Sequence, residues 1–179
     1  MTDQLADSGT RLASTIRDIP DFPIPGILFR DITTLLKDQA AFREAVEVMV
    51  APFTDQRIDV VVGVESRGFI FATPVAYALR AGFVPVRKLG RLPAPALRAE
   101  YELEYGTNTI EIHQDAIQAG QRVLVVDDLL ATGGTAAAAV DLVKRLGGEI
   151  VGLSFLVELK DLHGRKRLEG ETVHSAVKY

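Results

Sequence analysis

Cysteine is absent from the 179 residues of this chain, which excludes disulfide bonds and thiol chemistry. No apolar run is long enough to span a bilayer and no secretory signal pattern is present, so we expect a cytoplasmic protein without membrane association. An excess of positive charge is also missing. The net charge is −4, whereas a nucleic-acid-binding protein usually shows a basic face. The three histidines, His113, His163 and His174, lack metal-ligand spacing and are expected at the surface.

The composition is that of a soluble globular protein, with 47% hydrophobic and 25% charged residues. The length suits one domain, residues 1–179, with a full-sized core. No internal repeat, low-complexity tract or linker divides the chain.

Short apolar runs alternate with helical patterns along the chain. Strands are expected near residues 58–64, 83–87, 122–127 and 149–157, with a last edge strand at 172–179. Helices are expected at residues 39–53, 69–80 and 136–146. This alternation predicts an α/β fold: an open, mostly parallel twisted sheet with helices on both faces.

One stretch carries most of the chemical information. The apolar strand Val123–Val126 is followed by Asp127 and Asp128, then by a loop of small residues, and then by the predicted helix 136–146. The loop, which we call the phosphate loop, consists of Ala131, Thr132, Gly133, Gly134 and Thr135. A loop between the carboxyl end of a strand and the start of a helix is where α/β sheets bind anions.

The residue types in this stretch narrow the class of ligand that the loop could bind. The glycines let the backbone approach an anion, and Thr135 is a candidate helix cap. No Lys follows the glycines, so the nucleotide-binding GxxxxGK[ST] pattern is excluded. Adjacent carboxylates favour a ligand with hydroxyls, such as ribose, or with a divalent cation. The alternative is an ordinary strand–turn–helix with exposed acids. If the loop binds such a ligand, Gly133→Val is expected to weaken ligand binding greatly while the fold persists.

Cations occur at two further places along the same presumed sheet edge. Ser66 and Arg67 follow the strand at 58–64, and an Arg can fork onto pyrophosphate oxygens. Arg87, Lys88 and Arg91 lie among Gly and Pro residues, which suggests a mobile flap. A solvated turn and a solvated charged face are the respective alternatives.

Two other segments are unusual. Residues 21–36, which we call the hood, combine two prolines and a glycine with the apolar run Ile27-Leu28-Phe29. Taken alone, the hood is a buried connector or a binding loop. Residues 101–113 alternate around Gly106 and predict a hairpin. Within it, Glu104 and Tyr105 would by themselves be two exposed strand residues.

Together these motifs resemble the type I phosphoribosyltransferases, and most closely their adenine-specific members. The motifs are the hood, Ser66-Arg67-Gly68-Phe69, Leu103-Glu104-Tyr105-Gly106 and the Asp-Asp loop, in the order found in that family. The resemblance covers nearly the whole chain. It implies an enzyme of purine salvage that uses Mg²⁺ and transfers the 5-phosphoribosyl group from phosphoribosyl pyrophosphate to adenine, giving AMP and pyrophosphate. It also implies a homodimer.

The resemblance assigns a role to each candidate residue. Asp127, Asp128 and the phosphate loop (Ala131, Thr132, Gly133, Gly134, Thr135) would bind the ribose and its phosphate. Asp127 and Asp128 would also act in catalysis with the acid Glu104, and Tyr105 would act as a gate. Pyrophosphate would be bound by Ser66, Arg67, Arg87, Lys88 and Arg91. Lys88 and Arg91 would belong to a flexible flap and hairpin at about residues 88–113. Adenine would be bound by Leu28, Phe29 and Arg30. Mg²⁺ would bind through pyrophosphate, with Asp127 and Asp128 as further candidate ligands.

Two smaller points follow from the resemblance. A cis peptide bond is implied between Glu65 and Ser66. The family often has Pro where this chain has Thr34, and we expect little consequence. Two alternative functions remain open at this stage. A regulator that senses phosphoribosyl pyrophosphate would need a nucleic-acid-binding segment or would lack the hood and Glu104. An enzyme for another base would keep the loop and change the hood.

Overall fold

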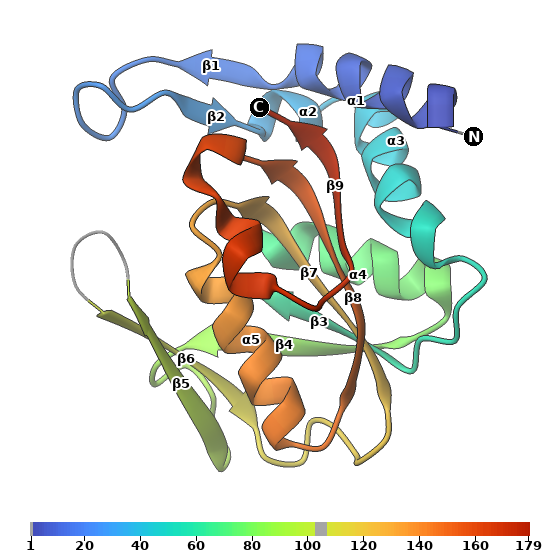
Figure 1. Ribbon diagram of the computed structural model, residues 1–179, viewed down its shortest axis with the longest axis vertical. Helices are drawn as coiled ribbons and strands as arrows, with labels where there is room; N and C mark the ends of the chain where they lie inside the picture. Colours follow the sequence, from blue (N-terminus) through green and yellow to red (C-terminus); the bar gives the residue numbers. More distant parts are fainter. Residues whose placement is uncertain (1, 103–106) are drawn as a thin grey trace.

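The computed structural model describes residues 2–102 and 107–179 (Figure 1). The helices are α1 Thr2–Thr15, α2 Thr33–Leu36, α3 Gln39–Val50, α4 Gly68–Leu79 and α5 Gly134–Arg145, with short 3₁₀ helices at Ala51–Phe53, Lys160–Leu162 and Gly164–Leu168. The strands are β1 Arg17–Ile19, β2 Phe29–Asp31, β3 Val60–Val64, β4 Gly82–Lys88, β5 Ala96–Glu102, β6 Thr107–His113, β7 Arg122–Leu130, β8 Glu149–Glu158 and β9 Val173–Lys178. Within the described part of the chain, no helix is long and apolar enough to cross a membrane. Glu104 and Tyr105 lie outside the described residues.

The main sheet has seven strands in the order β5-β6-β4-β3-β7-β8-β9. The strands from β4 to β9 in this order run parallel, and the antiparallel hairpin β5–β6 is added beside β4. This arrangement confirms the predicted open, mostly parallel sheet. The hairpin expected at residues 101–113 starts earlier, because β5 begins at Ala96.

Alternate residues of the central strands point into two hydrophobic cores, one on each face of the sheet. On one face, Val61 and Leu124 pack with apolar residues of α1, α3 and α4. On the other face, Val62 and Val125 pack with α5. In Figure 1, α5 lies in front of the sheet and α4 behind it. The prediction of helices on both faces is therefore confirmed, and it explains why β3 and the Val123–Val126 part of β7 carry no polar side chain.

The connections diverge at the middle of the sheet. From β3 the chain passes through α4 to β4 on one side, and from β7 it passes through α5 to β8 on the other. The carboxyl ends of β3 and β7 therefore mark a topological switch point, where open α/β sheets form their ligand crevices.

One predicted helix boundary is wrong in detail. Helix α5 starts at Gly134, and its cap is Gly133 in the left-handed conformation with φ 82°, so Thr135 is not the cap. The chain thus enters α5 two residues before the sequence pattern suggests. Helix α4, expected at residues 69–80, spans Gly68–Leu79 and is closed by Arg80, which adopts φ 56°.

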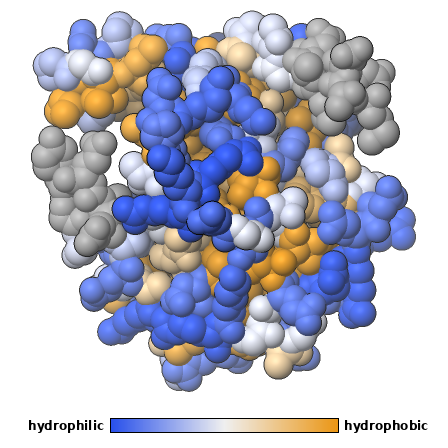
Figure 2. Space-filling view, viewed as in Figure 1, coloured by the Kyte–Doolittle hydropathy of each residue, from blue (hydrophilic) through white to orange (hydrophobic). Residues whose placement is uncertain are grey.

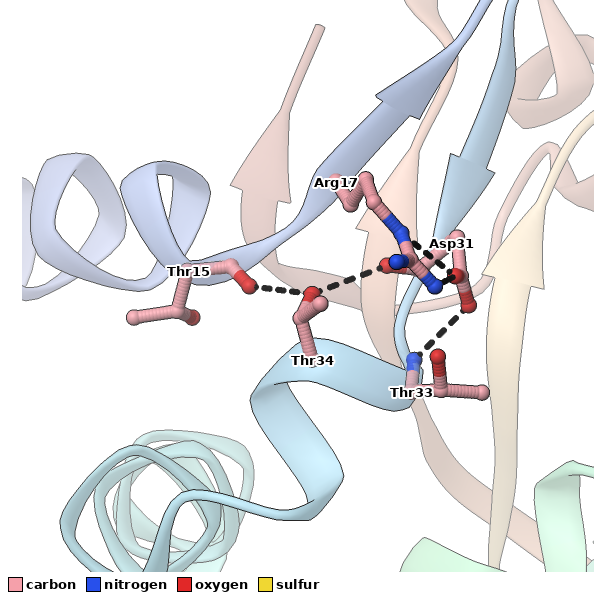
Figure 3. Close-up of polar contacts among 5 residues, drawn as sticks. All are labelled: Thr15, Arg17, Asp31, Thr33 and Thr34. Atoms are coloured by element: carbon pink, nitrogen blue, oxygen red, sulfur yellow. Dashed lines mark hydrogen bonds and ion pairs between the residues drawn. The ribbon is translucent and has the colours of Figure 1, made fainter.

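The hood is attached through a second, small sheet in which β1 pairs with β2 (Figure 1). Figure 3 shows its polar links. Arg17 forks onto the carboxylate of Asp31, with its Nε 3.0 Å from Oδ2, and the Thr33 amide donates to the same carboxylate at 2.9 Å. The hydroxyl of Thr34 donates to the Thr15 carbonyl at 2.6 Å. The hydrogen bonds from Arg17 and Thr33, chiefly that from Arg17, lower the pKa of Asp31 to about 2.

The tip of the hood is not a buried connector. Phe22, Ile24, Ile27 and Leu28 are all substantially exposed. Figure 2 shows an apolar surface at the place of the β1–β2 connection. Of the two interpretations of this segment, the structure excludes the buried connector, and an exposed apolar loop is typical of a surface that receives a ligand or partner.

Candidate active site

A cavity of about 330 Å³ opens at the carboxyl ends of β3 and β7. Its lining includes most of the residues predicted for the ribose, phosphate and pyrophosphate: Ser66, Arg67, Lys88, Asp127, Asp128, Ala131, Thr132, Gly133, Gly134 and Thr135. These residues come from three separate segments of the sequence. Their meeting in one cavity follows from the parallel arrangement of β3, β4 and β7.

The cavity also has lining residues that were not predicted, including Glu65 and Tyr101. Glu65 directly precedes the predicted Ser66, so its position could have been inferred. Tyr101 comes from β5, and only the pairing of β5 with β6 and of β6 with β4 brings it near the cavity. No local sequence signal indicates this position.

The two acidic residues differ in their partners. Asp128 is buried, and its Oδ2 lies 2.8 Å from the Nε of Arg67. Asp127 accepts a hydrogen bond from the Asp128 amide at 2.8 Å. Burial and the negative charge of Asp128 raise the pKa of Asp127 well above its ordinary value. Burial also raises the pKa of Asp128, while Arg67 opposes that rise, so Asp128 is the member that ionises more readily.

A glycine lets the start of α4 approach these acids. A Cβ atom at Gly68 would lie 2.5 Å from the Asp127 Oδ1, which is too close for any side chain. The first turn of α4 therefore packs directly against Asp127 near the end of β7. This contact places Arg67, the residue before Gly68, within reach of Asp128.

The phosphate loop leads directly into α5. Gly133 has φ 82°, and the amides that follow it begin the helix, where unpaired N–H groups and the helix dipole favour an anion. A Cβ at Gly133 would lie 2.3 Å from the carbonyl oxygen of Gly164. The expectation that Gly133→Val leaves the fold intact is therefore wrong, because valine would be strained at this φ and would collide with backbone.

The basic residues of the flap do not all face the cavity. Lys88 lines it, whereas Arg87 and Arg91 are not among its described lining residues. The Nε of Arg87 lies 3.2 Å from Glu65 Oε2, and its Nη1 donates to the Arg91 carbonyl at 3.1 Å. The peptide bond between Glu65 and Ser66 is cis, as the resemblance implied. The pyrophosphate role of Arg87 and Arg91 stays a prediction.

Phe29 of the hood lies against Arg67, one of the residues that line the cavity. The guanidinium carbon of Arg67 lies 5.7 Å from the centre of the Phe29 ring, and Phe22 packs edge-on against the same ring at 5.1 Å. The side chain of Arg30 turns elsewhere. It pairs with Asp18 and stacks on Tyr179 at 3.7 Å, which leaves only its backbone for the predicted adenine contact.

The residues of the cavity fit a magnesium ion that binds together with the phosphates of a substrate. Among the described residues, no group of three or more His, Cys, Asp or Glu side chains could hold a metal. Mg²⁺ commonly binds through one or two carboxylates together with substrate phosphates. Asp127 and Asp128 can supply such carboxylates, although Asp128 already has Arg67 as a partner.

Two histidines were wrongly expected at the surface. His113 and His174 are half-buried, and His113 Nδ1 and His174 Nε2 are buried without a hydrogen-bond partner in the described part of the structure. Burial lowers the pKa of His174. Only His163 is exposed as predicted.

The family model "Phosphoribosyl transferase domain" matches residues 32–176 of this chain. Since the match spans most of the chain and includes the acidic pair and the phosphate loop, the fold and the site define a phosphoribosyltransferase.

Individual relatives narrow this class. The chain is 60% identical to adenine phosphoribosyltransferase of Halothermothrix orenii over 162 residues, covering 90% of this chain and 95% of that protein. It is 56% identical to the Chloroflexus aurantiacus enzyme of the same name over 168 residues, covering 94% and 97%. The crystal structure of adenine phosphoribosyltransferase from Rhodothermus marinus aligns with a TM-score of 0.92 at 52% identity, covering 97% and 99% of the two chains.

A structure of the Saccharomyces cerevisiae enzyme, complexed with D-2,5-dideoxy-2,5-imino-altritol 1,6-bisphosphate and adenine, aligns with a TM-score of 0.90 at 40% identity, covering 96% and 99%. The chain therefore belongs to the adenine phosphoribosyltransferase family, the purine-salvage enzymes that transfer a phosphoribosyl group to adenine. This confirms the enzyme class, the fold and the activity that the sequence motifs implied.

Proposed function

We propose that the cavity at the ends of β3 and β7 binds phosphoribosyl pyrophosphate and transfers its phosphoribosyl group to adenine held by the hood. One observation carries this proposal. A helix amino terminus, a pair of carboxylates and an Arg guanidinium all line one cavity, and Phe29 of the hood lies against that guanidinium. The cavity thus offers separate places for a phosphate, a ribose, a pyrophosphate and a base.

The phosphate and ribose are assigned to the centre of the cavity. The amides of the phosphate loop, at the start of α5, bind the 5′-phosphate. Asp127 and Asp128 accept hydrogen bonds from the ribose hydroxyls. As N9 of adenine displaces pyrophosphate at the anomeric carbon, positive charge builds on the ribose ring. The ionised member of the acidic pair then favours this charge.

The leaving pyrophosphate is assigned to the side of the cavity nearest α4 and β4. Ser66 and Arg67 lie at the start of α4, and Lys88 lies at the end of β4. Arg67 can neutralise a departing oxygen while its Nε keeps Asp128 in place. Mg²⁺, bound to the pyrophosphate oxygens, would add positive charge at the leaving group.

The base is assigned to the hood. Phe29 stacks on the purine ring, and the backbone of Leu28 and Arg30 offers a carbonyl to N6 and an amide to N1 of adenine. The polarity of these backbone groups is fixed, so a 6-oxopurine would place like groups against each other. A mismatch of this kind can reduce the specificity constant by roughly four to five orders of magnitude. Glu104 is assigned the proton on the base, at N7, and Tyr105 the gate; both lie outside the described residues.

A homodimer is part of the proposal. Helix α4 is apolar on nearly all sides, which is typical of a helix covered by protein on all sides. However, the Tyr77 side chain is 89% exposed, and Ile70 on the same helix and Phe83 on β4 are partly exposed. A second copy on this surface would cover them. The cytoplasmic location expected from the sequence stays a prediction.

The experiment is a base panel. The protein is incubated with phosphoribosyl pyrophosphate, Mg²⁺ and, in turn, adenine, hypoxanthine, guanine or a pyrimidine, and pyrophosphate release is followed. Release with adenine at a specificity constant far above that of the other bases is expected. Comparable constants for adenine and hypoxanthine would contradict the assignment of the hood. A Phe29→Ala variant should lower the constant for every purine by a similar factor, because stacking does not distinguish them.

A further inference from the structure

The phosphate loop is packed against a strongly charged segment, residues 160–167. Residues 160–167 are rich in Lys and Arg, and most of these side chains are exposed. Gly164 and Leu168, in contrast, are buried. Leu168 packs into the core between α5 and the sheet. The segment therefore has a covered inner side that faces the loop.

The contact between Gly164 and the phosphate loop is made by backbone on both sides. A Cβ atom at Gly164 would lie 2.3 Å from the Ala131 carbonyl oxygen and 3.0 Å from the Gly133 nitrogen. A Cβ at Gly133 would in turn lie 2.3 Å from the Gly164 carbonyl oxygen. Each glycine thus occupies the space that a side chain on the other would need. Backbone atoms cannot move aside as a flexible side chain could.

Gly164 is itself held by the residue that follows it. Arg165 forks onto Glu158 at the end of β8 with two contacts of 2.7 Å, and its Nη1 donates to the Val173 carbonyl of β9 at 2.9 Å. Glu158 is buried, and the bond from Arg165 lowers its pKa. The Leu159 amide donates to the carbonyl of Leu130, the last residue of β7, at 3.0 Å. The segment is therefore fastened to the same strands that carry the loop.

We infer that Gly164 is a positioning residue for the phosphoribosyl substrate, which acts by fixing the phosphate loop from behind, with Arg165 holding Gly164 in place. This inference rests on the proposed binding of the 5′-phosphate by the loop. The Gly133 amide belongs to that loop, and Gly164 lies directly behind it. A displacement of about 1 Å at such a group can cost about 10²-fold in rate or affinity.

The decisive variant is Gly164→Ala. The new methyl group would push the loop forward, so the KM for phosphoribosyl pyrophosphate and the Kd for AMP, measured by calorimetry, should rise by about 10- to 100-fold. The KM for adenine should stay within about twofold, since the hood does not touch Gly164. The matched control is Gly82→Ala. Its Cβ would meet its nearest atom at 3.6 Å, an ordinary contact, and it lies at the opposite end of β4 from the cavity. Both KM values of this control should match those of the wild type.

Arg165→Lys provides a second variant in case Gly164→Ala does not fold. Lysine keeps the charge but cannot fork onto Glu158. Its KM for phosphoribosyl pyrophosphate should rise by about 3- to 10-fold with the KM for adenine unchanged. A structural role alone would lower the melting temperature without separating the two KM values. Equal changes in both KM values, or no change in either variant, would overturn the inference.

A third variant distinguishes the positioning role of Gly164 from the proposed binding of the 5′-phosphate by the loop. Thr135→Val removes a hydroxyl from the phosphate loop and keeps its shape. If Thr135→Val raises the Kd for AMP and Gly164→Ala does not, the positioning role falls and the phosphate site stands. If neither variant changes the Kd for AMP, the phosphate site is misassigned and the positioning role falls with it.

Discussion

The phosphate loop and the hood are held in place by different kinds of interaction. The loop is packed from behind by backbone, through Gly133 and Gly164, and it continues into helix α5, whose inner side is buried. The hood is carried by the small β1–β2 sheet, in which the two strands pair through their backbones and through side-chain contacts such as Arg17–Asp31 and Arg30–Asp18. Only the end of the hood, at Ile32 and Leu35, is packed into the core. The two halves of one active site therefore differ in how much of the molecule must rearrange before they can move.

This difference matches what each half is proposed to bind. A phosphate is recognised by a fixed array of amides, and such an array is effective only when it is preorganised. A flat, uncharged base is recognised by stacking and by a few backbone groups, and it must enter and leave in each turnover. A cover whose tip is exposed, as it is at Phe22, Ile24 and Leu28, can open with a smaller cost in free energy than a loop built into the core.

The largest effect is expected from Asp128→Asn, on the loop side of the site. The change removes the partner of Arg67 and the charge that is proposed to favour the ribosyl cation. Turnover should fall by about two to three orders of magnitude, with a smaller change in the KM for phosphoribosyl pyrophosphate. Steady-state kinetics at saturating substrate tests this. An increase in the KM for phosphoribosyl pyrophosphate with an unchanged kcat would show that Asp128 binds ribose without stabilising charge.

Phe29→Ala should have an intermediate effect, confined to the hood side. Base stacking on an aromatic side chain contributes about 1–3 kcal/mol, so kcat/KM for adenine should fall by about 5- to 150-fold. The Kd for pyrophosphate, measured with Mg²⁺, should not change. The exposed neighbour Phe22, changed to Ala, is the control, and it should have a smaller effect because it touches only the edge of the Phe29 ring. An equal loss in both variants would place the base elsewhere.

Arg17→Met tests whether charge holds the hood. The pKa of Asp31 is about 2 when folded, below its ordinary value of 3.8. The ionised form therefore stabilises the protein fully above pH 4, and this contribution is lost as the pH falls through 2. In the variant the pKa of Asp31 in the folded protein should lie closer to 3.8. The stability that the protein loses on acidification through protonation of Asp31 should therefore be smaller.

The measurement for Arg17→Met is the free energy of unfolding at pH 5 and at pH 2.5, for both proteins. The gap between wild type and variant should be larger at pH 5 than at pH 2.5. An equal gap at both values would show that the Arg17 side chain contributes packing and not charge. The KM for adenine should rise a few-fold at neutral pH while that for phosphoribosyl pyrophosphate stays the same.

The smallest effect is expected from Thr34→Val. The hydroxyl of Thr34 joins α2 to the end of α1 at 2.6 Å, a link that proline at this position could not make. Its loss should cost about 1 kcal/mol and lower the melting temperature by about 2–4 °C. Thr54→Val is the control, because its hydroxyl makes only longer bonds of 3.3 and 3.5 Å within one exposed turn. A larger loss for Thr54→Val would contradict the assigned role of Thr34.

The sequence predicted what depends on local pattern. Apolar runs before Asp127 and before Ser66 indicated strands, and parallel strands bring such residues to one sheet edge. The position of Gly164 could not be predicted, because about thirty residues separate it from the loop and its charged neighbours suggested solvent. The burial of His174 was missed for a similar reason, since it depends on packing from distant parts of the chain. For Arg87, the sequence indicated charge but not its pairing with Glu65.

Native-state hydrogen exchange at increasing denaturant tests the central difference most directly. Amides of β1 and β2 should exchange through a partial opening with a free energy below that of global unfolding, and Arg17→Met should lower this value further. Amides of α5 and of residues 164–168 should exchange only with global unfolding, and Arg17→Met should leave their protection relative to global unfolding unchanged. Exchange of β1, β2 and α5 through the same opening would contradict the account, because the two halves of the site would then be held equally.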